Sequence, residues 1–195
     1  MLKAMPIANQ KDLQYATSTD FCQIFHQDMN SLYLLSLLLT GDHEKAEQCF
    51  VEGLENAVGR NRVFKEWARS WARRIIIQNA LRMINPRSGD TNRAVNPLLV
   101  TGSDNTERTE RPEIGAVVQL PAFDRFVYVM SVLERYSDHD CSVLLGSARR
   151  DVLAARARAL QQMGSAAESY REHQLATNSD EAILHTSPLL ALQAC

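Results

Sequence analysis

The sequence lacks any pattern of cysteine and histidine that would hold a metal. Its 195 residues include only four cysteines, and none of them belongs to a CxxC pair. No histidine lies at zinc-ligand spacing from another histidine or from a cysteine, so a structural zinc site is not expected. The sequence also shows no secretory leader, and reduced thiols in a cytosol are then the simpler interpretation. We therefore expect a cytoplasmic protein without a metal or other cofactor.

Long hydrophobic runs and catalytic motifs are missing as well. Apolar stretches such as Leu32–Leu39 are far too short to span a bilayer, so membrane insertion is not expected. There is no nucleophile elbow, no Gly-rich phosphate loop, and no cluster of carboxylates and histidines at helical spacing. The sequence therefore favours a binding function over catalysis. β-type alternation of useful length is also absent.

Helical periodicity, by contrast, fills two blocks of the sequence, residues 20–85 and 113–163. The first block divides into a leucine-rich helix that stops at Gly41, a second helix at about 44–58, and a third at about 63–84. The sequence thus predicts an all-α fold with two small helical domains. The second domain is expected to contain a helix-turn-helix.

Polar segments surround these blocks. Residues 1–19 are aperiodic and are interpreted as a flexible arm. Residues 86–112 are rich in Ser, Asn, Thr, Gly and Pro, which is typical of a flexible linker between domains. Residues 164–195 form a polar tail of unassigned role with one short helical candidate at 180–185. We expect few contacts between the two domains.

Basic residues concentrate on the third predicted helix. Arg62, Lys65, Arg69 and Arg73 follow one another at steps of three, four and four residues, which places them on one helical stripe. Residues 60–93 hold nine basic and two acidic side chains, in a chain whose net charge is -2. The stripe predicts a polyanionic partner, although a solvated face is the alternative. The candidate DNA contacts here are Arg62, Lys65, Arg69, Arg73, Arg74, Gln78 and Arg82.

Two tryptophans lie on the same predicted helix. Trp71 continues an apolar stripe and is assigned to the core. Trp67 has no such assignment, and it is open whether it packs in the core or stacks on unpaired bases.

Residues 137–160 have the spacing of a helix-turn-helix. Such a motif needs a small residue between its helices, a Gly four positions later, and a β-branched residue six further on. Ser142, Gly146 and Val152 meet these requirements. The second helix, from residue 148 to about 163, is then the recognition helix. An ordinary helical hairpin is the alternative. The candidate DNA contacts on this helix are Arg149, Arg150, Asp151 and Arg156.

Taken in order, these segments resemble the extracytoplasmic-function group (group IV) of bacterial RNA polymerase sigma factors. The first block contains LLLTGDHEKAEQCFVEGLENA, which is similar to the family's leucine-rich helix, "LTGD" turn and acidic helix. It continues with FKEWARSWARRIIIQNALR, which is similar to the helix that contacts the promoter −10 element. The second block begins with LPAFDR, which fits the family's LPxxxR entry, and its helix-turn-helix falls where the −35-reading motif belongs.

The resemblance implies partners and roles. An acidic helix would dock on core RNA polymerase through Glu47, Gln48, Val51 and Glu52. The basic helix would hold the opened −10 strand, and the recognition helix would read −35 promoter DNA. An anti-sigma factor is a further candidate partner.

The sequence departs from the family pattern in two places. Gln48 and Val51 replace the usual Asp and Gln of the docking helix. Leu153, Ala154 and Ala155 replace the usual Lys-Ser-Arg of the recognition helix. These departures leave open an alternative: a sigma-like interaction adaptor that has lost sequence-specific promoter recognition.

Overall fold

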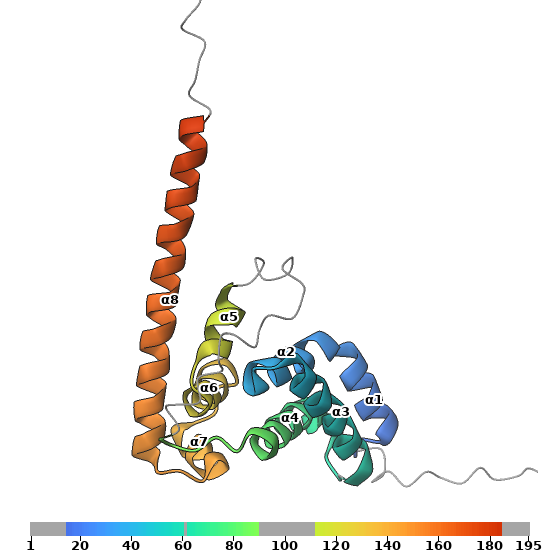
Figure 1. Ribbon diagram of the computed structural model, residues 1–195. Helices are drawn as coiled ribbons and strands as arrows, with labels where there is room; N and C mark the ends of the chain where they lie inside the picture. The colour runs from blue at the N-terminus through green and yellow to red at the C-terminus, as the bar shows by residue number, and fades with distance from the viewer. Residues whose placement is uncertain (1–14, 61, 90–111, 185–195) are drawn as a thin grey trace, which may run out of the picture.

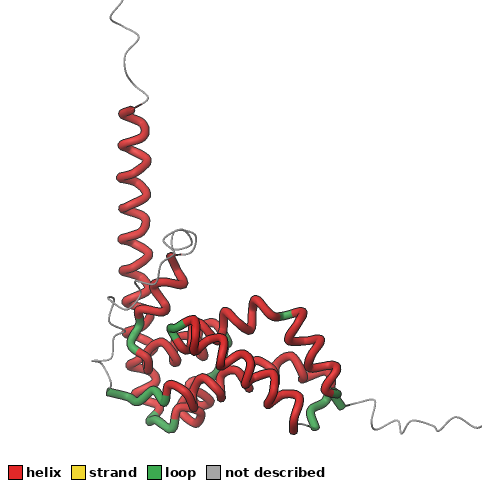
Figure 2. Tube along the Cα trace, turned by 45° about the vertical axis from the view of Figure 1, so that its right-hand side comes forward, coloured by secondary structure: helices red, strands yellow, loops and turns green. Residues whose placement is uncertain are grey.

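The computed structural model describes residues 15–60, 62–89 and 112–184. Within these ranges the regular elements are helices, accompanied by a single isolated bridge between Tyr15 and Phe64 (Figures 1 and 2). The predicted all-α fold is therefore confirmed. Most of the expected N-terminal arm, most of the expected linker and the C-terminal residues from 185 onward lie outside the described residues.

The first half of the chain packs four helices together. Helix α1 begins with a capping box in which the Thr17 and Asp20 side chains each accept a hydrogen bond from the other's backbone N–H. Helix α2 ends at Gly41, whose φ of 73° is left-handed. The Asp42 carboxylate then accepts a hydrogen bond from the Lys45 backbone N–H at 2.9 Å and caps the next helix. The bounds are α1 Ser18–Gln27, α2 Met29–Thr40, α3 His43–Arg60 and α4 Ala68–Ile84.

The basic helix begins later than the sequence predicts. Residues 62–64 are not helical: the Val63 carbonyl accepts a hydrogen bond from the Ala16 N–H at 2.7 Å, and the Phe64 ring stacks on Tyr15. A short 3₁₀ turn, η1 (Lys65–Trp67), then leads into α4. Pairing with the segment before α1 outweighs helical periodicity at this point. Arg62 consequently lies before the helix and does not belong to its stripe.

The second half begins with two short helices and ends with a long one. Helix α6 follows directly after Pro121 and continues into a π-helical turn, η3. Three residues separate α7 from α8. The bounds are α5 Pro112–Gln119, α6 Ala122–Tyr128, η3 Val129–Leu133, α7 Asp138–Leu145 and α8 Arg149–Leu184.

Helix α8 is much longer than predicted. The sequence predicted an end near residue 163, followed by a polar tail, but α8 spans 36 residues and ends at Leu184. Gly164 does not stop it, because a Gly within a helix costs only about 1 kcal/mol relative to Ala. The good helix formers around it, such as Gln161, Gln162 and Glu168, carry the helix through. Its distal part extends away from the other described helices in both views (Figures 1 and 2).

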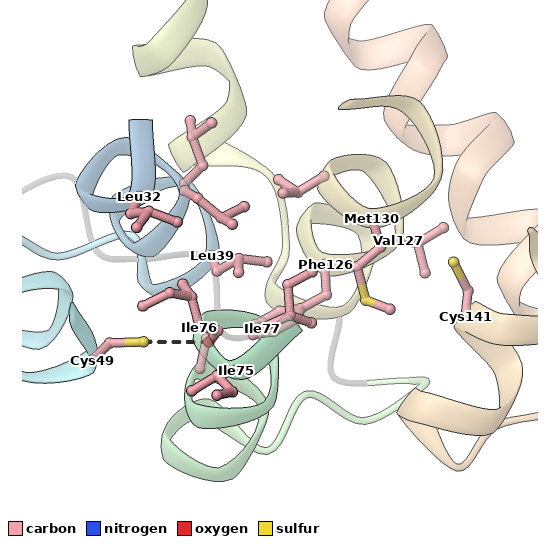
Figure 3. Close-up of a cluster of buried hydrophobic side chains, with 14 of the residues drawn as sticks. Leu32, Leu39, Cys49, Ile75, Ile76, Ile77, Phe126, Val127, Met130 and Cys141 are labelled. Atoms are coloured by element: carbon pink, nitrogen blue, oxygen red, sulfur yellow. Dashed lines mark hydrogen bonds between the residues drawn. The ribbon is translucent and has the colours of Figure 1, made fainter. Parts of the chain in front are cut away.

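One hydrophobic cluster extends through both halves of the molecule. Figure 3 shows Leu39 of α2 and Ile77 of α4 beside Phe126 of α6, and all three side chains are fully buried. Helix α2 also contacts both α5 and α6. The structure thus differs from the expectation of few contacts between the halves. Apolar side chains at the end of α2 and on α4 pack against side chains of the second half.

A buried arginine joins the two halves. Arg125 is 2% exposed, and its guanidinium donates hydrogen bonds to the carbonyl oxygens of Leu39 at 3.3 Å and Thr40 at 3.2 Å, at the end of α2. It also donates to the carbonyls of Val118 at 2.9 Å and Leu120 at 3.3 Å, at the end of α5. The cation therefore lies at the negative ends of two helix dipoles.

Gly41 makes room for this arginine. A Cβ atom at Gly41 would lie 2.8 Å from a terminal nitrogen of Arg125. Burial lowers the pKa of Arg125 to about 10, so the guanidinium is still charged at neutral pH. The contact ties the left-handed turn after α2 directly to the second half.

Candidate functional site

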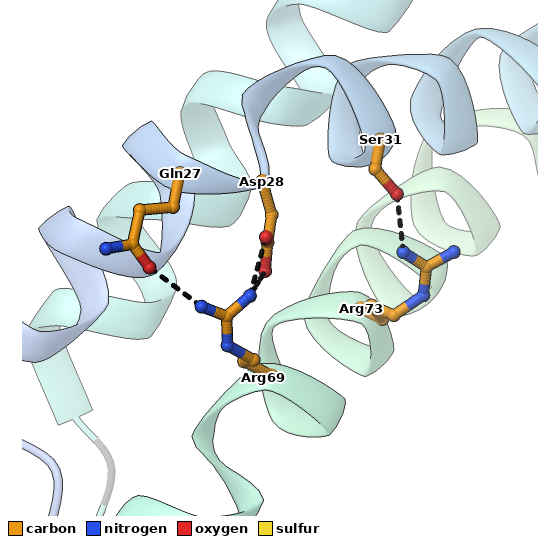
Figure 4. A network of polar contacts seen from close by, with 5 residues as sticks. All are labelled: Gln27, Asp28, Ser31, Arg69 and Arg73. Atoms are coloured by element: carbon orange, nitrogen blue, oxygen red, sulfur yellow. Dashed lines mark hydrogen bonds and ion pairs between the residues drawn. The ribbon is translucent and has the colours of Figure 1, made fainter.

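The cations of the predicted α4 stripe contact carboxylates from other elements. The Lys65 ammonium lies 3.4 Å from the Asp20 carboxylate on α1. Arg69 donates to both carboxylate oxygens of Asp28, at 2.5 and 2.6 Å, and to the Gln27 side chain at 2.7 Å (Figure 4). The sequence predicted one helical stripe of cations here, but it did not reveal that carboxylates from α1 and the α1–α2 junction oppose Lys65 and Arg69.

Arg73 makes the most buried of these ion pairs. Its Nε donates to the Glu134 carboxylate at 2.7 Å, a second guanidinium nitrogen contacts the other carboxylate oxygen, and a third donates to the Ser31 hydroxyl at 2.8 Å. The Glu134 side chain is only 9% exposed. The hydrogen bonds to Glu134 raise the pKa of Arg73. Because Glu134 follows η3, this pair is a second polar link between the halves.

The remaining α4 candidates are more available to a ligand. Arg74 and Arg82 are exposed and Gln78 is half-buried. Arg82 also donates to the buried side chain of Asn79. Arg62 is exposed, in the segment before η1.

The two tryptophans separate as a core residue and a surface residue. Trp71 is half-buried and packs against the hydrophobic cluster, which confirms its assignment to the core. Trp67 is 59% exposed. Its ring meets the edge of Phe64 at a centroid distance of 5.4 Å, and Phe64 in turn stacks on Tyr15 at 4.8 Å. These three rings form an aromatic row beside Lys65.

Helix α3 presents the predicted docking residues to solvent. Glu47 and Gln48 are exposed, and Val51 is 46% exposed between acidic neighbours. Glu52 is half-buried and accepts a hydrogen bond from the Gln48 side chain at 3.0 Å. A single exposed aliphatic side chain is normal on a protein surface, so the docking role of this face stays a prediction.

The α7–turn–α8 unit has the local geometry that its spacing predicts. Gly146 ends α7 in the left-handed region, with a φ of 59°. Nothing lies near the position of a Cβ there, so the backbone angle alone favours glycine. Val152 is fully buried. The Ser142 carbonyl accepts the Ser147 N–H at 3.0 Å, and Ser137 caps the start of α7.

The first turn of α8 projects two arginines into solvent. Arg149 and Arg150 are both exposed. Arg150 lies 3.6 Å from the carboxylate of its neighbour Asp151, and 90% of the Arg150 side chain is exposed. Such a pair contributes little in water. Asp151 is half-buried.

The next turns of α8 are tied to the body of the protein. Arg156 donates to the Asp138 carboxylate at 2.6 Å and so connects α8 to the start of α7. Arg158 donates to both oxygens of the buried Asp124 at 2.6 and 2.9 Å. Arg156 was a candidate DNA contact, whereas in the structure its guanidinium holds the two helices together.

The sequence did not identify the residues that join the halves. Arg125 belongs to the quoted LPAFDR segment, but nothing in its spacing signals burial. Glu134 was not singled out at all. Their roles follow from tertiary contacts with α2 and α4, which a local pattern does not contain.

No helix among the described residues is both long and apolar enough to cross a bilayer. No three His, Cys, Asp or Glu side chains in the described ranges gather as a metal site would require. No protein-family model matches the chain, and no curated protein sequence matches it.

Among solved structures, the chain is similar to a protein in the "Co-crystal structure of the sigma factor RpoE in complex with the anti-sigma factor NepR from Bartonella quintana". The alignment covers 77% of this chain and 98% of that chain, with 19% sequence identity and a TM-score of 0.44. A likeness this distant assigns no function to this chain.

Proposed function

We propose that this protein is a sigma-type transcription initiation factor, which binds core RNA polymerase and directs it to promoter DNA. The observation that carries the proposal is the start of α8. A left-handed turn at Gly146 sets two helices against each other, and the second begins with exposed Arg149 and Arg150. Helix-turn-helix proteins place this end of their second helix in the major groove.

The proposed readout of double-stranded DNA is narrow. Arg149 and Arg150 reach guanine edges or phosphates from the first turn, and a bidentate contact to guanine contributes about 1–3 kcal/mol of discrimination. One turn later, exposed Leu153 and Ala154 offer only apolar contact to a thymine methyl. We therefore expect a weak sequence preference concentrated on the base pairs that the two arginines reach.

The first half supplies the second proposed DNA contact. Trp67 is exposed for stacking on an unpaired base, and aromatic stacking contributes about 1–3 kcal/mol per base. Arg62, Arg74 and Arg82 are exposed cations in the same half. Arg69 and Arg73 join this surface only if a phosphate replaces the carboxylate that each now contacts.

The acidic face of α3 is the proposed polymerase-docking surface. Its exposed residues Glu47, Gln48 and Val51 lie on one side of the helix. This face belongs to a different helix from the proposed DNA contacts, so the two ligands do not compete for the same side chains. An anti-sigma factor as a further partner stays a prediction.

A run-off transcription assay tests the proposal. Core polymerase is mixed with the full chain and with templates selected from random duplexes. We expect a defined transcript that the double variant Arg149→Ala, Arg150→Ala abolishes. Arg171→Ala, which changes an exposed arginine farther along α8, is the matched control and should leave the transcript unchanged.

The alternative function is an interaction adaptor without promoter specificity. It is favoured by the exposed leucines of α8, Leu153 at 42% and Leu160 at 48%, because a DNA-reading helix usually carries polar side chains there. Co-sedimentation with core polymerase, combined with no transcript from any template, would favour the adaptor and contradict promoter recognition.

A further inference from the structure

Helix α8 carries an apolar stripe that stays exposed along its outer side. The stripe consists of Leu153, Ala157, Leu160, Gly164 and Ala167, at steps of four, three, four and three residues, and all five are exposed. Other residues of the same helix are fully buried in the core: Val152, Ala155 and Ala159. Alternating steps of three and four define the seam of a two-stranded coiled coil. The outer stripe therefore has the spacing of a helix–helix contact.

The distal part of α8 needs more support than the body of the protein gives it. This part of the helix extends beyond the other described helices in both views (Figures 1 and 2). Side chains from Ala167 to Glu172 are exposed. In proteins, most helical stability comes from packing one face of the helix against a neighbour rather than from helix propensity. A partner helix that follows the stripe and continues beyond Ala167 would supply such packing.

The charges of α8 indicate which partner fits. At the start of α8, Arg149 and Arg150 extend into solvent, whereas Arg156 and Arg158 are held by carboxylates of the body. Farther along the helix, the exposed charged side chains are Glu168, Arg171 and Glu172, two acidic and one basic. The exposed surface of the helix is thus basic at its start and net acidic farther along. A second α8 running in the opposite direction places the basic part of each copy beside the acidic part of the other. Antiparallel helix dipoles are also favourable.

We propose that the protein forms a homodimer in which the outer stripes of two α8 helices pack in antiparallel orientation. Setting Ala157 of one copy opposite Ala167 of the second brings Leu160 of each copy against Gly164 of the other. In the two central layers a large side chain then faces a glycine, and an Ala–Ala layer flanks them on each side, which lets the helices pack closely. The dimer rests on the stripe and its charges, independently of any DNA-binding role.

The dimer has one consequence that does rest on the proposed function. Leu153 lies one helical turn from Arg149 and Arg150 on the same exposed side of α8. A second copy along the stripe therefore covers the surface proposed to enter the major groove. Dimer formation and duplex binding through α8 exclude each other.

Sedimentation velocity of the full chain, from low to high micromolar concentration, tests the dimer. We expect a species of twice the 21.9 kDa mass of one chain. Leu160→Glu should raise the dimer dissociation constant about tenfold or more, because it buries a carboxylate opposite Gly164. Met29→Glu, which places the same charge at an exposed apolar position on α2, is the matched control and should not change it. A monomer at all concentrations, or a dimer indifferent to Leu160→Glu, would overturn the proposal.

Disulfide trapping tests the orientation. In a background of Cys22→Ser and Cys195→Ser, equal amounts of Ala157→Cys and Ala167→Cys chains are mixed and oxidised. The antiparallel dimer predicts crosslinks mainly between the two different variants. Crosslinks mainly between identical variants would contradict it. Leu160→Glu should still co-sediment with core polymerase, so a failed dimer is distinguishable from a failed transcription function.

Discussion

Two arginine-rich surfaces of this protein look alike in sequence and differ in structure. On α4, Arg69 and Arg73 contact the carboxylates of Asp28 and Glu134. At the start of α8, Arg149 and Arg150 extend into solvent, and the ion pair found there joins Arg150 to its own neighbour Asp151 at 3.6 Å. Charge spacing locates a basic face, but packing against other elements decides whether its charge is available to a ligand.

The largest expected effect is a loss of unfolding free energy on replacing Arg125, whose side chain is fully buried. Arg125→Leu removes the guanidinium and, with it, the hydrogen bonds to four carbonyl oxygens at the ends of α2 and α5. Removing a buried, hydrogen-bonded charge of this kind costs about 3–5 kcal/mol of unfolding free energy. Urea denaturation measures it, with Arg171→Ala as the exposed control. If Arg125→Leu lost as little unfolding free energy as the control, Arg125 would not hold the halves together.

A smaller free energy is expected from the ion pair between Arg73 and Glu134, which joins the halves. In a double-mutant cycle of Arg73→Ala and Glu134→Ala, the coupling energy should be about 1–2 kcal/mol, because Glu134 is nearly buried and the contact is bidentate. The same cycle on Arg69 and Asp28, which are more exposed, should give a smaller value. Equal coupling in the two cycles would mean that burial does not separate these pairs.

The smallest effect, a change in the pKa of Asp20, is expected on replacing Lys65. The pKa of Asp20 is lowered first by hydrogen bonds from the Thr17 backbone and hydroxyl, and only last by Lys65. Thr17→Ala keeps the backbone N–H and removes only the hydroxyl, which still lowers the pKa of Asp20 more than Lys65 does. NMR titration should therefore show a larger rise in the pKa of Asp20 in Thr17→Ala than in Lys65→Ala. The opposite order would make Lys65 a firmly held cation. The expected order makes Lys65, in η1, a loosely held cation.

The sequence predicted the features that depend on local geometry. Gly41 and Gly146 adopt the left-handed angles expected of helix ends, and Val152 is buried as the spacing requires. Helical periodicity identified the α-class and the main elements. These features arise from neighbours within a few residues, so a local pattern contains the information.

Features that depend on distant residues were not predictable in this way. Arg62 lies outside the helix because the strand-like segment at Val63 pairs with Ala16. Glu134 faces Arg73 across 61 positions of sequence. The length of α8 was missed for another reason: Gly164 and a polar composition suggested an end, while the helix formers around it favoured continuation.

The salt dependence of duplex binding shows which arginines are available to phosphate groups. Each lost phosphate contact removes about one unit from the slope of log K against log salt. We expect Arg149→Ala with Arg150→Ala to flatten the slope by about two units. We expect Arg69→Ala with Arg73→Ala to change the slope much less, because carboxylates already hold those guanidinium groups. A large loss of slope in the α4 pair, with none in the α8 pair, would contradict this difference between the two surfaces.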